Sequence, residues 1–286
     1  MTELNLKSAD GHILHAYDQG PRDGGALPVF WLHGTPNIGP PPAPLAADAA
    51  RLGLRWIGYD RPGYGASTRR EGRTVAAAAA DVARIADALG IERFAVVGHS
   101  GGGPHALACA ALLPARVLAA VSIAGLAPYG APGLDWFGGM HPCGAAGLRA
   151  AVAGQAEKEA YEASDPAFDP ALFTEADRAA LAGPWSWFDS VVGPAMAQGP
   201  GGLIDDDLAY VRPWGFECAQ LSRPLLLLHG DEDRIVPKDH GAWLARHCRT
   251  AELWQLPHDG HISVLACAPR ALDWLRHQAA SPAGTR

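Results

Sequence analysis

The sequence lacks an apolar run long enough to cross a bilayer and lacks the features of a secreted protein. Its longest apolar stretches, such as residues 117–127, are too short for a membrane span and are interrupted by Ser or Gly. Residues 1–10 (MTELNLKSAD) have no basic segment followed by an apolar one, so they do not resemble a signal peptide. These absences predict a cytoplasmic protein.

Cysteine is scarce and scattered. The chain has five cysteines, an odd number, and none of them belongs to a Cys-x-x-Cys pair. This pattern is typical of the reducing cytosol and offers no ligand set for a metal ion. We therefore expect no metal site.

Positive charge is also in short supply, with 23 Lys and Arg against 30 Asp and Glu and a net charge of −7. A nucleic-acid partner requires a basic surface that neutralises phosphates, and an acidic surface also disfavours anionic membranes. We therefore expect no nucleic acid and no membrane partner. A small neutral substrate would feel little of this charge, and a homo-oligomer stays possible.

What the sequence does contain is a regular alternation of short apolar segments and helical ones. The near-continuous hydrophobicity of the short segments is what parallel strands covered on both faces require, and it predicts strands at residues 28–33, 54–59, 94–98, 117–124 and 224–229. Helices are predicted at residues 44–52, 74–89, 102–113, 240–248 and 262–279. Together with an antiparallel edge hairpin at residues 3–17, this order predicts an α/β fold with a doubly wound, mostly parallel sheet.

The alternation stops between residues 126 and 222, where only helical periodicity is visible, at residues 148–163 and 174–181. Because a structureless insertion of this length is improbable in a compact domain, we expect a mainly helical cap. The core would then comprise residues 1–125 and 223–286. The segment holds four of the nine Trp, the candidate pocket residues Trp136, Trp185, Trp187 and Trp214, which pack either around a substrate or on one another.

The segment Gly98-His99-Ser100-Gly101-Gly102 matches the pattern G-x-S-x-G between a predicted strand and a predicted helix. A sharp turn there leaves no room for side chains two residues to either side of the serine. The serine hydroxyl is then exposed above a helix N-terminus, as a nucleophile requires. His99 is either a packed neighbour or a substrate contact, and a phosphate-binding turn is the competing interpretation of the motif.

Two further loops follow predicted strands, and a third precedes the predicted C-terminal helix. In His33-Gly34-Thr35-Pro36 the N–H of Thr35 can point at a substrate oxyanion, with the N–H of Gly101 as the second donor. In the loop at residues 230–237, Asp233 is favoured as the acid over Asp231 and Glu232. Near the C-terminus, His261 is favoured as the base over His258.

Ser, then Asp, then His is the chain order of one known triad scaffold. Over nearly its whole length the sequence resembles the α/β-hydrolase superfamily, through the segments 33–36, 60–65, 98–103, 230–237 and 260–261. The resemblance implies a nucleophile at Ser100, an acid at Asp233, a base at His261 and oxyanion donors at Thr35 and Gly101. It also implies that residues 60–65 form a structural loop.

These residues favour a serine hydrolase that cleaves a carboxylic ester or lactone of a small, fairly apolar substrate, without cofactor or metal. Serine at the elbow excludes the dehalogenases and epoxide hydrolases of this superfamily, which use aspartate. C–C bond hydrolysis and cofactor-free haloperoxidase or perhydrolase activity would use the same triad. An aminopeptidase similar to proline iminopeptidases would show different motifs and need cap carboxylates, for which Glu157, Glu159, Glu162, Asp205, Asp206, Asp207 and Glu217 are available. A non-catalytic small-ligand receptor is the alternative from another class.

Overall fold

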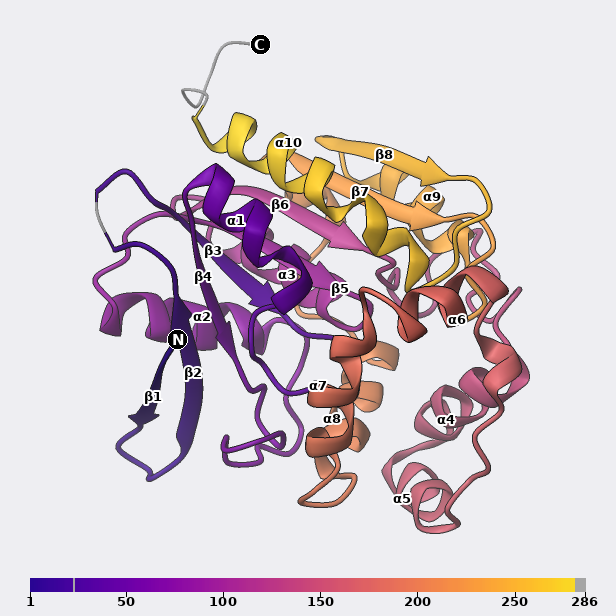
Figure 1. The fold of residues 1–286 in the computed structure, drawn as a ribbon. Coiled ribbons are helices and arrows are strands. Elements are labelled where there is room, and N and C mark those ends of the chain that lie inside the picture. The colour runs from indigo at the N-terminus through magenta and orange to yellow at the C-terminus, as the bar shows by residue number, and fades with distance from the viewer. Residues whose placement is uncertain (23, 281–286) are drawn as a thin grey trace.

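The computed structural model describes residues 1–22 and 24–280, and these form an eight-stranded sheet with helices on both faces (Figure 1). The strand order across the sheet is β1-β2-β4-β3-β5-β6-β7-β8. The strands are β1 (Thr2–Lys7), β2 (Ile13–Gln19), β3 (Leu27–Leu32), β4 (Leu54–Tyr59), β5 (Phe94–His99), β6 (Val117–Ile123), β7 (Leu225–Gly230) and β8 (Ala251–Leu256). Strands β3 to β8 pair in parallel, whereas the β1–β2 hairpin joins β4 in antiparallel fashion. The predicted doubly wound, mostly parallel sheet with an edge hairpin is confirmed.

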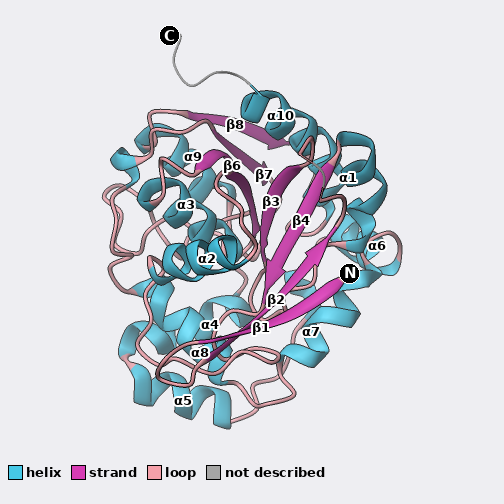
Figure 2. Cartoon of the chain, turned by 90° about the vertical axis from the view of Figure 1, so that its left-hand side faces the viewer, coloured by secondary structure: helices cyan, strands magenta, loops and turns pink. Residues whose placement is uncertain are grey.

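Two apolar layers hold this sheet, because each face buries its side chains against a different set of helices (Figure 2). One face packs against α2 (Ala77–Ala88), α3 (Gly102–Leu112) and α9 (Lys238–His247). The other packs against α1 (Ala46–Leu52) and α10 (Ala268–Ala280). All six residues of β5 are buried, as are those of β7, which is why both strands are apolar almost without interruption.

Residues 124–224, between β6 and β7, contain no strand in the structure, and we call them the insertion. Its helices are α4 (Pro142–Ala153), α5 (Gln155–Ala163), α6 (Glu175–Ala182), α7 (Asp189–Ala195) and α8 (Gly201–Val211). In Figure 1 they gather on the side to which the arrowheads of the central strands point. The insertion therefore lies at the sheet edge where the predicted site residues are placed.

Several elements differ from the sequence prediction, among them α7 and α8, for which no helix was predicted. The helical pattern at residues 148–163 belongs to two helices, α4 and α5, because the chain breaks at Gly154, whose φ of 141° no helix accommodates. The terminal helix starts as a 3-10 turn at Ser263–Cys267 before α10. Strand β8 was not predicted, since its residues alternate between intermediate and exposed positions and give no buried apolar run. None of the described helices is both long and apolar enough to span a membrane.

Candidate active site

Ser100 occupies the turn between β5 and α3 with a φ of 54°, in the left-handed region that non-glycine residues rarely adopt. The turn is held because Ser100 donates its N–H to the carbonyl of Ile123 at 2.8 Å. It is also too tight for side chains around the serine. A Cβ at Gly98 would lie 2.1 Å from the carbonyl oxygen of Gly102, and a Cβ at Gly102 would lie 1.9 Å from that of Leu32. The motif thus folds into a strained strand-to-helix turn that presents a half-buried serine.

Asp233 and His261 come together although 28 residues separate them in the sequence. The Nδ1 atom of His261 lies 2.8 Å from Oδ2 of Asp233, and both side chains are buried. The other carboxylate oxygen of Asp233 accepts the N–H groups of Ile235 and Val236 at 2.8 and 2.9 Å, which fixes its orientation. Burial lowers the pKa of His261, but the charge and hydrogen bond of Asp233 outweigh burial, so the pKa is raised above the ordinary histidine value.

His99 links the serine turn to the histidine loop. Its Nε2 lies 3.1 Å from the carbonyl oxygen of His261, and the two rings are 5.1 Å apart. Burial and the proximity of His261 lower the pKa of His99 to about 3, so this ring is neutral at physiological pH. Ser100 follows His99 directly in the sequence, so the serine turn is joined to the loop of His261 through the His99 side chain.

The rival residues of the same loops are exposed or half-buried. The side chain of His258 is 89% exposed, and its Nδ1 faces Glu232 at 3.2 Å. Asp231 accepts the N–H of His258 at 2.8 Å and so braces the loop. These three residues bond to one another, whereas Asp233 and His261 are buried and bonded to each other.

Thr35 and Gly101 are neighbours across the site. A Cβ added at Gly101 would lie 2.5 Å from Oγ1 of Thr35 and 2.3 Å from the hydroxyl of Tyr210. A Cβ added at Gly34 would come within 3.4 Å of the Cβ of Ser100. Within the described part of the chain, the N–H groups of Thr35 and Gly101 have no hydrogen-bond partner. Two N–H groups without a protein partner therefore lie close together beside the serine turn.

A buried charge network supports the Thr35 loop. Arg61 donates to the carbonyl oxygens of His33 and Gly34 and forms an ion pair with Asp206 of α8, with 2.6 Å between Nη2 and Oδ2. Asp206 also accepts from the Thr35 hydroxyl at 2.6 Å.

A second cation completes this network, because Nη1 of Arg73 lies 2.6 Å from Oδ1 of Asp206. Burial would raise the pKa of Asp206, but Arg61 and Arg73 hold it well below its usual range. An ionised carboxylate of the insertion therefore braces the predicted oxyanion loop.

Asp177, on α6 of the insertion, is a site residue that the sequence analysis missed. Its carboxylate accepts the N–H groups of His261, Ile262 and Ser263 at 3.2, 2.7 and 2.9 Å. The sequence signal, Thr174-x-x-Asp177, is the pattern of a capping box and points only to the start of its own helix. The partners 84 to 86 residues away become visible only in the fold.

The four candidate tryptophans divide into two groups. Trp136 and Trp214 pack in the apolar layer of α2, α3 and α9, and their indole N–H groups donate to the carbonyls of Ala127 and Tyr210. Trp185 and Trp187 instead contact Phe188, whose ring lies 5.7 Å from that of His99. The second group is the one beside the serine turn.

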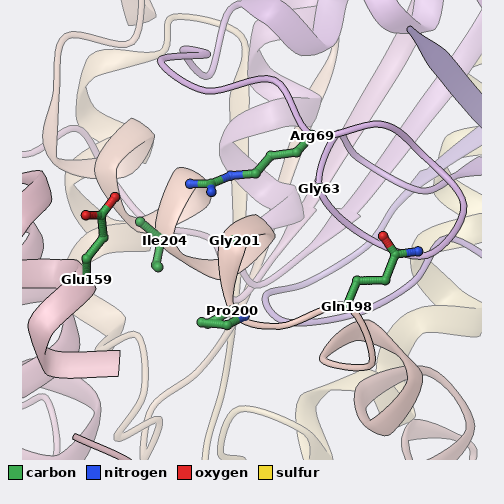
Figure 3. A pocket seen from close by; sticks show the side chains of 7 residues that line it. All are labelled: Gly63, Arg69, Glu159, Gln198, Pro200, Gly201 and Ile204. Carbon is green, nitrogen blue, oxygen red and sulfur yellow. The ribbon is translucent and has the colours of Figure 1, made fainter. Parts of the chain in front are cut away.

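A cavity of about 300 Å³ lies on the seam between core and insertion (Figure 3). Its wall includes Arg69, which pairs through Nε with Asp205 at 2.9 Å, and also Gln198 and Glu159. None of its seven lining residues is a predicted nucleophile, acid, base or oxyanion donor. It is therefore separate from the Ser100 site.

A sequence model of the alpha/beta hydrolase fold family matches residues 28–266. The chain belongs to this family. Among curated relatives, the α/β hydrolase is 35% identical over 133 residues to a non-heme chloroperoxidase of Streptomyces lividans. That alignment covers 43% of this chain and 45% of the relative, less than half of each. It is 29% identical over 280 residues to a 2-hydroxymuconate semialdehyde hydrolase of Pseudomonas putida, covering 92% of this chain and 89% of the relative.

Among solved structures, an esterase from Rhodococcus superposes on this α/β hydrolase with a TM-score of 0.70, at 20% identity over 98% of this chain and 99% of that one. An enol-lactonase from Burkholderia xenovorans superposes with a TM-score of 0.66, at 21% identity over 97% and 100% of the two chains. At this level of identity the likenesses show the fold.

Proposed function

We propose that this α/β hydrolase cleaves the ester or lactone bond of a small, fairly apolar substrate through a Ser100–His261–Asp233 triad. The observation that carries the proposal is the buried hydrogen bond between Asp233 and His261 beside a serine held at a left-handed φ. A carboxylate on Nδ1 fixes the tautomer whose Nε2 can accept a proton, and a strained turn exposes the hydroxyl.

In the proposed mechanism, Nε2 of His261 takes the proton of Ser100 while Oγ attacks the acyl carbon. The oxyanion is stabilised by the N–H groups of Thr35 and Gly101. His261 then protonates the leaving alcohol. Water, deprotonated by the same histidine, attacks the acyl-enzyme, and the carboxylic acid and the free Ser100 hydroxyl are released. Asp233 stabilises the imidazolium in both steps.

The positive charge beside the Thr35 loop supports this chemistry. Two buried arginines, Arg61 and Arg73, share the carboxylate of Asp206, so the network carries a surplus positive charge. Arg61 touches the carbonyls of His33 and Gly34, next to the proposed oxyanion donors. A preorganised positive potential at this position favours a developing negative charge.

The apolar character of the substrate rests on the insertion acting as a cap. Phe188 packs against His99, and Trp187 extends the cluster to Trp31 of β3. Aromatic side chains at the edge of a site favour an apolar acyl or alkoxy group. The carboxylates of α8 that an aminopeptidase would need are engaged by Arg69, by Arg61 with Arg73, and by Lys158.

One curated relative, aligned over 92% of this chain, is named as a 2-hydroxymuconate semialdehyde hydrolase, which favours C–C bond hydrolysis as the second candidate. The same triad would serve it. Release of a carboxylic acid from a diketone that contains no ester bond, with p-nitrophenyl esters left intact, would establish this candidate over the first.

The test is labelling of the wild type with a fluorophosphonate, read by intact mass, beside Ser100→Ala and the control Ser164→Ala. Ser164 is exposed on the insertion and lies outside the site. We expect one adduct on the wild type and on Ser164→Ala, and none on Ser100→Ala. The wild type and Ser164→Ala should also turn over p-nitrophenyl esters. Folded wild type without an adduct would contradict the proposal and favour a ligand-binding protein.

A further inference from the structure

The carboxylate of Asp177 joins two segments that are distant in the sequence. On its own side it accepts the N–H of Thr174 at 3.1 Å and closes the capping box of α6. On the other side it accepts three consecutive N–H groups of residues 261–263, the last of them at the first residue of the 3-10 turn Ser263–Cys267. The N–H groups at the start of a helical segment have no partner within it. Asp177 supplies that partner from the insertion.

The fit between Asp177 and the histidine loop is tight. A Cβ at Gly260 would lie 2.1 Å from Oδ2 of Asp177 and 2.6 Å from its Cγ. Gly260 is anchored in turn, because its N–H donates to Oγ of Ser263 at 2.7 Å. The backbone that carries His261 can therefore not shift toward α6, and it cannot shift away without losing hydrogen bonds.

The charge of Asp177 is fixed as firmly as its position. Burial would raise the pKa of Asp177, but the N–H groups of Ser263, Ile262 and Thr174 and the neighbouring His261 lower it below the ordinary value. The groups that face His261 are Asp233 from the loop after β7, Asp177 from α6, His99 from β5 and His229 from β7. Asp177 is thus a second carboxylate near this imidazole, and its charge raises the pKa of His261, as Asp233 does.

We propose that Asp177 is a positioning residue for His261: the insertion holds the proposed catalytic base in place through three backbone hydrogen bonds. The negative charge of Asp177 supports this role, because it favours the protonated form of the imidazole. The proposal rests on the proposed function of His261. In this arrangement Asp233 orients the ring and Asp177 orients the backbone that carries the ring. Catalysis then depends on contact between α6 and the core.

The test compares Asp177→Asn with two controls. In Asp177→Asn one carboxylate oxygen becomes an NH₂ group that faces two N–H donors, so half of the hydrogen bonds are lost. Thr174→Ala removes the hydroxyl that accepts the N–H of Asp177 and so weakens the capping box of α6. It leaves the Asp177 carboxylate free to accept the N–H groups of residues 261–263. Asp169→Asn makes the same chemical change at an exposed cap of the insertion, where the carboxylate accepts the N–H of Ala171 and lies 3.6 Å from Nε2 of His141.

We expect Asp177→Asn to lower kcat about 10²-fold with little change in KM, because a small misplacement of a catalytic group costs about that factor. In this variant the acid limb of the pH profile of kcat/KM moves to lower pH, because loss of a negative charge near His261 lowers the pKa of its ring. Both controls keep the kcat and the pH profile of the wild type. An equal loss in Thr174→Ala and Asp177→Asn, or an unchanged acid limb in Asp177→Asn, would overturn the proposal.

A second variant approaches the contact from the other side. Gly260→Ala inserts a methyl group where the Asp177 carboxylate lies and is expected to reproduce the loss of kcat, even if Asp177→Asn does not fold. Wild-type kcat in folded Gly260→Ala would refute the inference. NMR titration of the His261 ring separates this result from the proposed function: a lower ring pKa in Asp177→Asn than in the wild type is expected whether or not the protein turns over esters.

Discussion

The imidazole of His261 is buried among groups that pull its pKa in opposite directions. Burial disfavours a charged imidazole, whereas Asp233 and Asp177 favour it, and the carboxylates prevail. A base acts only in its neutral form. A raised pKa therefore means that the enzyme loses activity while the pH is still close to neutral.

We expect kcat/KM for an ester to fall on the acid side with a midpoint above pH 6.5, the ordinary histidine value. Activity is lost as the pH falls through the raised pKa, because protonated His261 cannot accept the proton of Ser100. A pH–rate profile of the wild type measures this midpoint. In Asp233→Asn the midpoint moves down and kcat drops about 10⁴-fold. A wild-type midpoint at or below 6.5 would show that burial prevails over the two carboxylates.

Single residues differ in how far the sequence reveals them. Ser100 is encoded by its neighbours, because Gly98 and Gly102 are needed for the turn itself. Asp233 follows β7, a predicted strand, and parallel strands end at one edge of the sheet. His261 follows β8, which was not predicted, so its only local signal is its place after Gly260 and before the terminal helix. Asp177 has no local signature of its contact with residues 261–263, since its spacing to Thr174 predicts only a helix cap.

At the scale of elements, α8 carries three consecutive carboxylates that face three different partners. Asp205 pairs with Arg69, Asp206 with Arg61 and Arg73, and Asp207 with Lys158. Successive residues of a helix point about 100° apart, so one helix can reach the core on one side and α5 on another. The position of α8 is thus set by charge pairs of unequal burial.

Neighbouring substitutions on α8 are expected to differ sharply in their effect on stability. Asp206→Asn leaves Arg61 and Arg73 buried without their counter-charge and lowers the free energy of unfolding by about 3–5 kcal/mol. Asp205→Asn loses a pair whose arginine is 35% exposed and costs about 0–1 kcal/mol. Urea unfolding of both variants measures the difference. Similar losses in the two would mean that water reaches the Asp206 network.

The elements that the sequence did not predict share a physical cause. Strand β8 is an edge strand with half-exposed side chains, and α7 and α8 contain Pro194 or three adjacent acids that disturb the helical pattern. The central strands and their helices were predictable because burial on both faces imposes an apolar run. Elements held by polar contacts with the core give no such signal.

At the scale of the whole molecule, two buried carboxylates of the insertion couple folding to pH. Asp206 and Asp177 have lowered pKa values in the folded chain, because arginines hold the first ionised and backbone N–H groups the second, against the opposing effect of burial. An unfolded aspartate titrates near 3.8. Their contribution to stability is therefore complete above that pH and is lost as the pH falls from there toward the folded values.

We expect the urea midpoint of the wild type to decline steeply once the pH falls below about 4. Asp206→Asn is less stable at neutral pH but declines less steeply there, because it lacks one of the two carboxylates that must be protonated. Unfolding curves at a series of pH values, followed by circular dichroism, test this. Parallel pH profiles for wild type and variant would show that other groups govern acid unfolding.

The two anchoring carboxylates also limit how this chain can be redesigned. Members of a fold family are commonly diversified by exchanging the variable segment over a constant core. Here a transplanted insertion would remove Asp206 from the arginines behind Thr35 and Asp177 from the loop of His261. A chimera that keeps every core residue would thus lose the supports of both its oxyanion loop and its base. Grafts that retain acidic residues at these two positions are the ones expected to stay active.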